Sequence, residues 1–204
     1  MAKSPKTPPA LHPETLMMSH GYDPFLSEGA VKPPVFLTST FAFKNAEDGA
    51  AFFAAMREKD NKQAGLIYSR FNHPNLQIAE ERLALYEQGE AAAVFSSGMS
   101  AIATTIISQV GSGDVILRSQ PLYGGTETLI TNSLVSLGIK TTSFIDGLDL
   151  DSMRRAANKA LALGPVAMIF TETPSNPTNT LINFGFINQI ADEIATKQAQ
   201  RPVI

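Results

Sequence analysis

From residue 46 onward, the apolar positions alternate between a helical spacing and short continuous runs. Leu76, Ala79, Leu83 and Tyr86 recur at intervals of three and four residues, which predicts one apolar face of a helix. Short runs such as residues 166–170 are typical of strands buried on both faces. These patterns predict helices over residues 46–60, 76–86, 98–110, 126–137, 150–161 and 186–199, and strands over 91–95, 115–117, 139–145 and 166–170.

Helices that alternate with apolar strands indicate βαβ units. The sequence therefore predicts an α/β fold, in which a sheet of parallel type, mixed in part, carries helices on both faces. In such open sheets, ligands bind beyond the carboxyl ends of the strands. The strand-to-helix junctions are therefore where candidate chemistry is sought.

Residues 1–45 differ from the rest because proline recurs along them. Proline fixes φ and lacks an N–H group, so we expect an extended arm. The apolar stretches 35–37 and 41–43 are too apolar to remain solvated and predict packing on another surface, for which a second subunit is a candidate. The predicted division is an inter-subunit arm with one helix over 1–65, and a large domain over 66–204. Residues 201–204 begin another apolar run at the chain's end, so we expect a fragment or a nicked chain with an incomplete large domain.

Composition narrows the class of protein. The 204 residues carry a formal charge of −3 and are 44% hydrophobic, which excludes intrinsic disorder and argues against nucleic acid as a partner. There is no cysteine, which excludes disulfides and thiolate chemistry. We expect no metal site, because the three histidines show no ligand spacing. Neither a membrane span nor a secretory signal is recognisable, and we expect a cytoplasmic protein.

Two short motifs have the chemistry of an anion site. Ser97-Gly98-Met99 follows the predicted strand 91–95, where free N–H groups and the positive end of a helix dipole attract an anion. An ordinary capped helix is the alternative. Tyr68 and Arg70 are two residues apart, so an extended backbone would present a phenol and a guanidinium on the same side, as suits a phosphate. The alternative is a surface arginine beside a packed tyrosine.

Two further junctions have stacking and hydrogen-bonding potential. Tyr123 precedes Gly124 and Gly125 at a predicted helix start, where its ring could stack on a planar ligand. A core tyrosine beside a flexible turn is the alternative. Glu172 and Asn176 lie in a loop that two prolines stiffen after the strand 166–170, as suits orientation-critical hydrogen bonds. A plain turn is the alternative. A cis Asn176–Pro177 bond is one possibility there.

Taken in order, these motifs resemble the pyridoxal-phosphate enzymes of cysteine and methionine metabolism, which include cystathionine γ-synthase, cystathionine lyases, methionine γ-lyase and acylhomoserine sulfhydrylases. The resemblance covers roughly residues 20–204 and implies the large domain of a fold-type I transferase. The stretches that carry it are Pro33-Pro34-Val35, Thr38-Ser39-Thr40-Phe41, Tyr68-Ser69-Arg70, Ser97-Gly98-Met99, Leu122-Tyr123-Gly124-Gly125-Thr126 and Glu172-Thr173-Pro174-Ser175-Asn176-Pro177.

The resemblance implies a role for each candidate residue. Gly98 and Met99 would give backbone N–H groups to the phosphate of pyridoxal 5′-phosphate. Tyr68 and Arg70 would reach that phosphate from the neighbouring subunit of a homo-oligomer, a dimer of dimers. The roles of the remaining three residues concern the cofactor ring: Tyr123 would stack on it and transfer protons, Asn176 would hydrogen-bond its hydroxyl oxygen, and Glu172 would support the loop.

The implied activity is γ-replacement or γ-elimination on homoserine-derived or sulfur amino acids, as in trans-sulfuration by cystathionine γ-synthase. Methionine γ-lyase and acylhomoserine sulfhydrylase activities stay open. So does a non-catalytic α/β fragment that binds phosphate or a partner. Two departures matter: Asn72-His73-Pro74-Asn75 replaces the family's Asn-Pro-Thr, and Gly125 stands where methionine γ-lyases often have cysteine, which favours a synthase or a generic γ-enzyme. The family's cofactor-linked lysine, pyridine-nitrogen aspartate and substrate-carboxylate arginine would lie beyond residue 204, so we expect this chain alone to be inactive.

Overall fold

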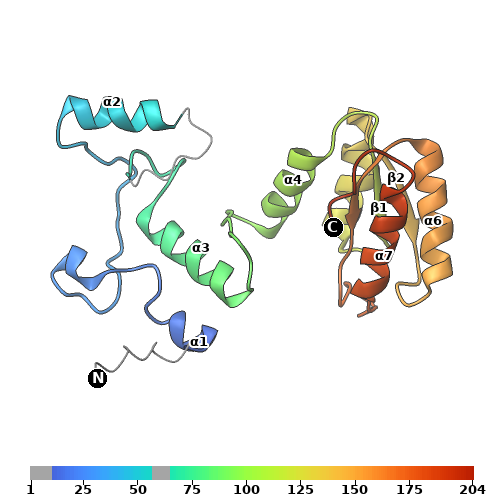
Figure 1. The fold of residues 1–204 in the computed structure, drawn as a ribbon, viewed down its shortest axis with the longest axis horizontal. Coiled ribbons are helices and arrows are strands. Elements are labelled where there is room, and N and C mark those ends of the chain that lie inside the picture. The colour runs from blue at the N-terminus through green and yellow to red at the C-terminus, as the bar shows by residue number, and fades with distance from the viewer. Residues whose placement is uncertain (1–10, 57–64) are drawn as a thin grey trace, which may run out of the picture. The chain divides into compact units, whose positions relative to one another are not determined.

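A computed structural model describes residues 11–56 and 65–204 of the chain. The chain forms two compact units, Met1–Val94 and Phe95–Ile204. Each unit is described by itself, and Figure 1 shows the elements of both. Within the described residues, no helix has the length and apolar character needed to cross a membrane.

The second unit is built on a parallel sheet. Its strands are β1 (Val115–Ser119), β2 (Lys140–Phe144) and β3 (Val166–Phe170), in the order β2-β1-β3. All five residues of the central strand β1 are buried, as expected for a strand covered on both faces. The predicted α/β class with a parallel sheet is confirmed. Near the chain's end, Val203 forms a parallel bridge beside β3, with Ile169 N–H donating to its carbonyl oxygen at 2.7 Å.

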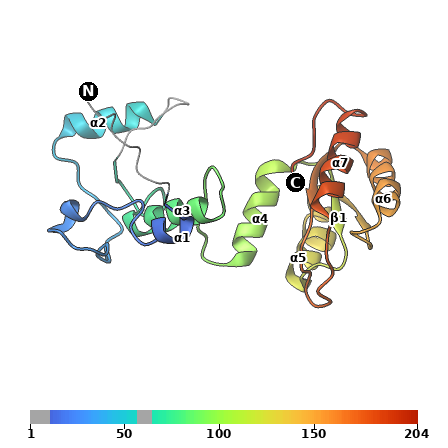
Figure 2. The ribbon, with the colours of Figure 1, turned by 60° about the horizontal axis from the view of Figure 1, so that its bottom comes forward.

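Helices cover both faces of this sheet (Figures 1 and 2). One face packs against α6 (Leu150–Leu163) and α7 (Phe184–Ala195), through a cluster of buried residues that includes Met153, Ala160, Ile187 and Ile190. The opposite face packs against α4 (Gly98–Gln109) and the helical segment after α5 (Gly124–Thr128), through a second cluster that includes Ile106, Ile116, Ile130 and Leu134. The carboxyl ends of the strands therefore open onto loops that precede these helices.

The helix predicted over 126–137 is interrupted. After α5, the chain forms a π-helical turn, η2 (Leu129–Ser133), and a 3₁₀ turn, η3 (Val135–Leu137). The hydroxyl of Thr131 donates to the carbonyl oxygen of Glu127 at 2.8 Å, which adds a side-chain donor to the helical ladder at this point. Gly138 ends the segment with φ of 82°, a conformation that glycine adopts without steric penalty.

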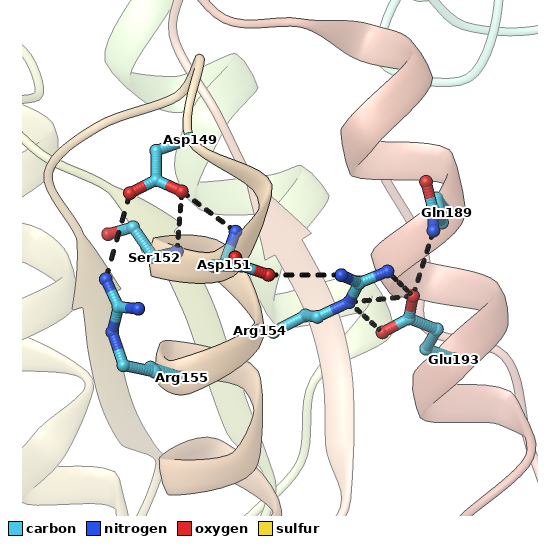
Figure 3. Close-up of polar contacts among 7 residues, drawn as sticks. All are labelled: Asp149, Asp151, Ser152, Arg154, Arg155, Gln189 and Glu193. Carbon is cyan, nitrogen blue, oxygen red and sulfur yellow. Dashed lines mark hydrogen bonds and ion pairs between the residues drawn. The ribbon is translucent and has the colours of Figure 1, made fainter.

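An exposed polar cluster joins α6 to α7 (Figure 3). The guanidinium of Arg154 on α6 lies 2.7 Å from Glu193 on α7 and 3.2 Å from Asp151 on its own helix. Gln189 also donates to Glu193, at 3.1 Å. The hydrogen bonds from Arg154 lower the pKa of Glu193 from its ordinary value of 4.5 against the opposing effect of desolvation, and Gln189 adds to the lowering.

The first unit holds the arm against a helix. Its elements are α1 (Pro13–Leu16), η1 (Pro24–Ser27), α2 (Ala46–Ala55) and α3 (Pro74–Tyr86). Asn75 on α3 accepts from Phe36 N–H at 2.9 Å and donates to the carbonyl oxygen of Pro34 at 2.8 Å. Because these bonds tie the arm to α3, the compact units meet between residues 94 and 95, whereas the sequence predicted a division after residue 65. The described part of the arm, residues 11–45, contains the short helices α1 and η1 and otherwise consists of turns and irregular segments.

Two further predicted elements differ from the structure. Residues 91–95 are extended but form no strand, because no neighbouring strand in the described part of the chain pairs with them. Their apolar character signalled a strand, yet a strand exists only where its backbone groups find a partner. The predicted helix 46–60 is α2, which ends at Ala55, and its last predicted residues lie outside the described part of the chain.

Candidate functional site

The first turn of α4 presents free backbone donors. Ser97 caps the helix: its hydroxyl accepts the N–H of Ser100 at 3.1 Å, and the hydroxyl of Ser100 accepts the N–H of Ser97 at 3.1 Å. The N–H groups of Gly98 and Met99 are the next two donors, and helix geometry gives them no intrahelical acceptor. A Cβ built on Gly98 would have no atom within 4 Å. The predicted anion site is therefore open to a ligand at its backbone.

Tyr123 lies in the loop between β1 and α5. Leu122 beside it is only 4% exposed and anchors the loop in the core, whereas Tyr123 itself is 45% exposed. A Cβ built on Gly125 would lie 2.7 Å from Cε1 of Tyr123 and 3.0 Å from Sδ of Met99. The phenol ring and the thioether therefore flank the same glycine, which places the ring beside the first turn of α4.

The carboxylate of Glu172 joins two of the predicted loops. One of its oxygens accepts the backbone N–H of Tyr123 at 2.8 Å, and the other accepts the backbone N–H of Asn176 at 2.7 Å. The N–H of Glu172 donates to the hydroxyl of Ser119, the last residue of β1, at 3.3 Å. The structure thus brings Gly98, Met99, Tyr123, Glu172 and Asn176 together at one end of the sheet.

The loop that carries Asn176 is held by its own hydrogen bonds. Ser175 is 2% exposed, and its hydroxyl accepts the N–H of Thr180 at 3.2 Å, while its N–H donates to the carbonyl oxygen of Thr180 at 3.0 Å. The Thr173–Pro174 and Asn176–Pro177 peptide bonds are cis. Asn176 itself is exposed, so its side-chain amide is available to a ligand at the rim.

Tyr68 and Arg70 belong to the first unit. Tyr68 forms an antiparallel bridge with Thr40, and the chain then turns, with Phe71 N–H donating to the carbonyl oxygen of Tyr68 at 2.8 Å. The extended geometry predicted for these residues is therefore wrong, because the backbone bends directly after Tyr68. The two side chains still meet, since Cζ of Arg70 lies 5.7 Å from the centroid of the Tyr68 ring. Both residues are exposed.

Sequence reasoning missed two residues beneath these loops. Ser119 accepts the Glu172 N–H, and the buried guanidinium of Arg118 forms an ion pair with the partly exposed Glu127 at 2.7 Å. In the sequence, the only indication of these contacts is an arginine and a serine at the end of an apolar strand. No local spacing rule pairs a strand residue with a helix residue nine positions later.

Comparison with known proteins agrees with this geometry. The family model described as "Cys/Met metabolism PLP-dependent enzyme" matches residues 14–199. The chain belongs to this family. It is 36% identical over 178 residues to an L-methionine gamma-lyase of Pseudomonas deceptionensis, covering 87% of this chain and 41% of that protein. It is 29% identical to an O-acetyl-L-homoserine sulfhydrylase of Leptospira meyeri, covering 89% of this chain and 38% of that protein. The chain therefore spans about two fifths of the length of these relatives.

Comparison with solved structures agrees with this family assignment. The fold superposes on an O-acetylhomoserine (thiol)-lyase of Campylobacter jejuni with a TM-score of 0.76 and 31% identity, covering 91% of this chain and 42% of that one. That structure contains N′-pyridoxyl-lysine-5′-monophosphate. The metB protein of Corynebacterium glutamicum shares the fold, with a TM-score of 0.73 and 22% identity, covering 92% of this chain and 44% of that one.

The residues of the second unit fit pyridoxal phosphate, the cofactor of this family. A phosphate needs donors at an accessible helix start, which Gly98 and Met99 supply without a side chain at Gly98 to block them. A planar ring needs an exposed aromatic face, which Tyr123 offers. The exposed side chain of Asn176 adds an amide at the rim of the site.

Proposed function

We propose that the protein is a pyridoxal-phosphate-dependent enzyme that replaces or eliminates the γ-substituent of homoserine-derived or sulfur amino acids. The observation that supports this most is the carboxylate of Glu172, which hydrogen-bonds the backbones of Tyr123 and Asn176 at once. One side chain thereby sets the relative position of a stacking ring and a polar amide. Family membership supports the cofactor class, and the named relatives support the substrate class.

In this proposal, the chain's own residues bind and orient the cofactor. The N–H groups of Gly98 and Met99 hold the phosphate, and the positive end of the α4 dipole favours its charge. Tyr123 stacks on the ring and moves a proton at its phenol oxygen, while the side chain of Asn176 donates to the ring hydroxyl oxygen. Pyridoxal phosphate, when bound, supplies an electron sink for the bonds that break near the amino group of the substrate.

The choice between replacement and elimination rests on different observations. Relatives named methionine gamma-lyase favour elimination from L-methionine, whereas a relative named sulfhydrylase favours replacement on an O-acylated homoserine. Gly125 favours replacement, because the resemblance associates a cysteine at that position with methionine γ-lyases. We therefore propose γ-replacement, of the cystathionine γ-synthase or sulfhydrylase type, as the first candidate activity.

We further propose that the protein acts in the cytoplasm as a homotetramer. The absence of cysteine is compatible with a reducing compartment. Exposed apolar residues of the arm favour burial against a second copy: Phe25, Leu26, Val31, Val35 and Leu37 are each at least 77% exposed. Tyr68 and Arg70 would then complete the phosphate site of a neighbouring subunit.

Binding of pyridoxine 5′-phosphate tests the site without requiring a cofactor-linked lysine, since this probe lacks the aldehyde. We expect Glu172→Gln to weaken binding about tenfold, because the amide's NH₂ group cannot accept the N–H that the second carboxylate oxygen accepted. Glu193→Gln, the same change on α7, is the matched control and should leave affinity unchanged. Equal binding by both variants, or none by the wild type, would contradict the proposed site.

Product analysis then separates the two reactions. The protein with bound pyridoxal phosphate is supplied with O-acetyl-L-homoserine and sulfide, or with L-methionine alone. Formation of homocysteine from the first mixture supports replacement, whereas methanethiol and 2-oxobutanoate from the second support elimination. Absence of turnover with either substrate, measured with a chain that also supplies the family's cofactor-linked lysine, would contradict the proposed activity.

A further inference from the structure

A partly buried ion pair connects β1 to α5, on either side of the Tyr123 loop. Arg118 on β1 is 6% exposed, and its Nη1 lies 2.7 Å from Oε2 of Glu127 on α5. Nε of Arg118 is also buried and has no acceptor in the part of the chain that the structure describes. A charged group held in this way contributes little net stability, because the loss of hydration offsets much of its attraction to the partner. The pair therefore calls for a role other than stabilising the fold.

The position of the pair indicates that role. Arg118 and Glu127 stand at the two ends of the segment 119–126, which carries Tyr123. The N–H of Glu127 donates to the carbonyl oxygen of Tyr123 at 2.9 Å, so the residue that binds Arg118 also holds the backbone of the tyrosine. On the other side of the loop, Glu172 holds the N–H of Tyr123 at 2.8 Å. The backbone of Tyr123 is thus fixed at both of its polar groups.

The helix α5 has few restraints from its own local structure. The helix contains only five residues, Tyr123 at its N-cap position makes no side-chain capping bond, and a π-helical turn follows directly. Short helices without caps contribute little to their own stability. The orientation of this segment against β1 must therefore come from tertiary contacts, among which the Arg118–Glu127 pair connects strand and helix directly.

We propose that Arg118 and Glu127 are positioning residues, whose ion pair holds the Tyr123 loop in the geometry that receives the cofactor ring. In this proposal, the pair makes no contact with the ligand. It acts through the Glu127 N–H and the Tyr123 carbonyl. This inference rests on the proposed function of Tyr123, and it can be tested on the protein without any cofactor.

Hydrogen exchange of single amides, followed by NMR, reports the loop directly. In the double variant Arg118→Met/Glu127→Met, both charges are removed together and apolar volume is retained, so we expect the melting temperature to change little. We expect the amide hydrogen of Tyr123 to exchange about tenfold faster than in the wild type, because local opening of the loop no longer has to break the ion pair. Arg118→Lys, which keeps a cation near Glu127, should retain most of the protection.

The half-buried pair between α6 and α7 is the matched control (Figure 3). Arg154→Met/Glu193→Met removes the same two residue types, at the same 2.7 Å separation, and should not alter the exchange of the Tyr123 amide. Unchanged exchange in the Arg118→Met/Glu127→Met variant would overturn the inference. Failure of that variant to fold would also overturn it, since the pair would then hold the fold and not the loop.

A second readout connects the loop to the cofactor. With pyridoxal phosphate bound, the visible circular dichroism band reports how the ring is held, and we expect it to change in the Met/Met variant at positions 118 and 127 but not in Arg118→Lys. If the wild-type protein binds no pyridoxal phosphate, the proposed function fails while the exchange result stands. If the wild type binds it and exchange is unaltered, only the positioning role fails.

Discussion

Tyr123 rests against a residue that has no side chain. The point where a Cβ would lie on Gly125 is 2.7 Å from the tyrosine ring, closer than real Cβ contacts come. Any larger residue at this position must displace the ring or the thioether of Met99, which lies 3.0 Å from the same point. Gly125 therefore determines the position of the Tyr123 ring, because the absence of a side chain leaves room for the ring.

Gly125→Ala tests this role. We expect the free energy of unfolding to change by less than about 1 kcal/mol, because alanine favours the helix while the displaced ring is partly exposed and free to move. The Tyr123 ring should shift, with weaker binding of pyridoxine 5′-phosphate. Gly124→Ala is the control, since a Cβ at Gly124 would meet no atom within 4 Å. Equal affinity in the two variants would count against the ring's dependence on Gly125.

At the scale of elements, the Arg154–Glu193 pair links α6 to α7 and depends on pH. The pKa of Glu193 is lowered, first by its hydrogen bonds from Arg154, so the ionised carboxylate is favoured in the folded state. A lowered folded pKa stabilises the fold above the ordinary pKa of 4.5, and this stabilisation is lost as the pH falls through the folded value.

We therefore expect Glu193→Gln to be slightly less stable than the wild type at pH 7, with the difference shrinking below pH 4.5. The effect is small because exposed ion pairs are screened by solvent. Urea denaturation at pH 7 and at pH 3 measures it. In an Arg154→Met background, the same substitution should show a much weaker pH dependence; a difference that stays constant with pH would contradict the assignment to this pair.

Elements with a strong local pattern were predictable from the sequence. The strand over 166–170 matches β3 residue for residue, because an apolar run bounded by Gly164-Pro165 and a polar loop leaves few alternatives. The helix around residues 76–86 is also confirmed, as α3. The break after Thr128 was not predictable, since the π-helical turn arises from packing on the sheet and from the Thr131 hydroxyl.

The candidate site was predictable in its loops but not in its connections. The sequence indicated Tyr123, Glu172 and Asn176 because glycines and prolines shape their loops at strand ends. That Glu172 would bind two backbone N–H groups depends on the three-dimensional distance between loops 49 residues apart, which no sequence spacing encodes. Arg118 was hidden for the same reason, since its partner Glu127 lies across a strand-to-helix turn.

At the scale of the whole molecule, the first unit leaves much apolar surface exposed. Leu37 is 94% exposed and Phe25 is 89% exposed. Apolar surface of this extent is typical of an interface. It supports the proposal that the arm and the segment carrying Arg70 contact a second copy of the chain.

Arg70→Ala tests whether one subunit completes the site of another. We expect the substitution to weaken retention of pyridoxal phosphate about tenfold, because a charged donor to phosphate is lost, and to leave the melting temperature unchanged, because Arg70 is exposed. Retention is measured by gel filtration and visible absorbance. Arg155→Ala, which removes another exposed arginine, is the control.

Mixing subunits gives the stricter version of that experiment. If Arg70 serves a neighbouring site, Arg70→Ala and Tyr123→Phe subunits refolded together should recover activity that neither has alone, since some sites then contain both wild-type residues. Recovery no greater than the average of the two separate variants would place Arg70 in the same site as the Tyr123 of its own chain, or in none.

The open backbone at the first turn of α4 has one more consequence. Main-chain amides neither titrate nor change with side-chain identity, so the donors that Gly98 and Met99 offer to an oxyanion would stay the same at every physiological pH, and any pH dependence of binding would come from the anion itself. Substitutions of Met99 would then be tolerated according to the shape of the new side chain. Gly98 would be constrained by steric bulk alone, because a Cβ there would project into the open space that the oxyanion needs.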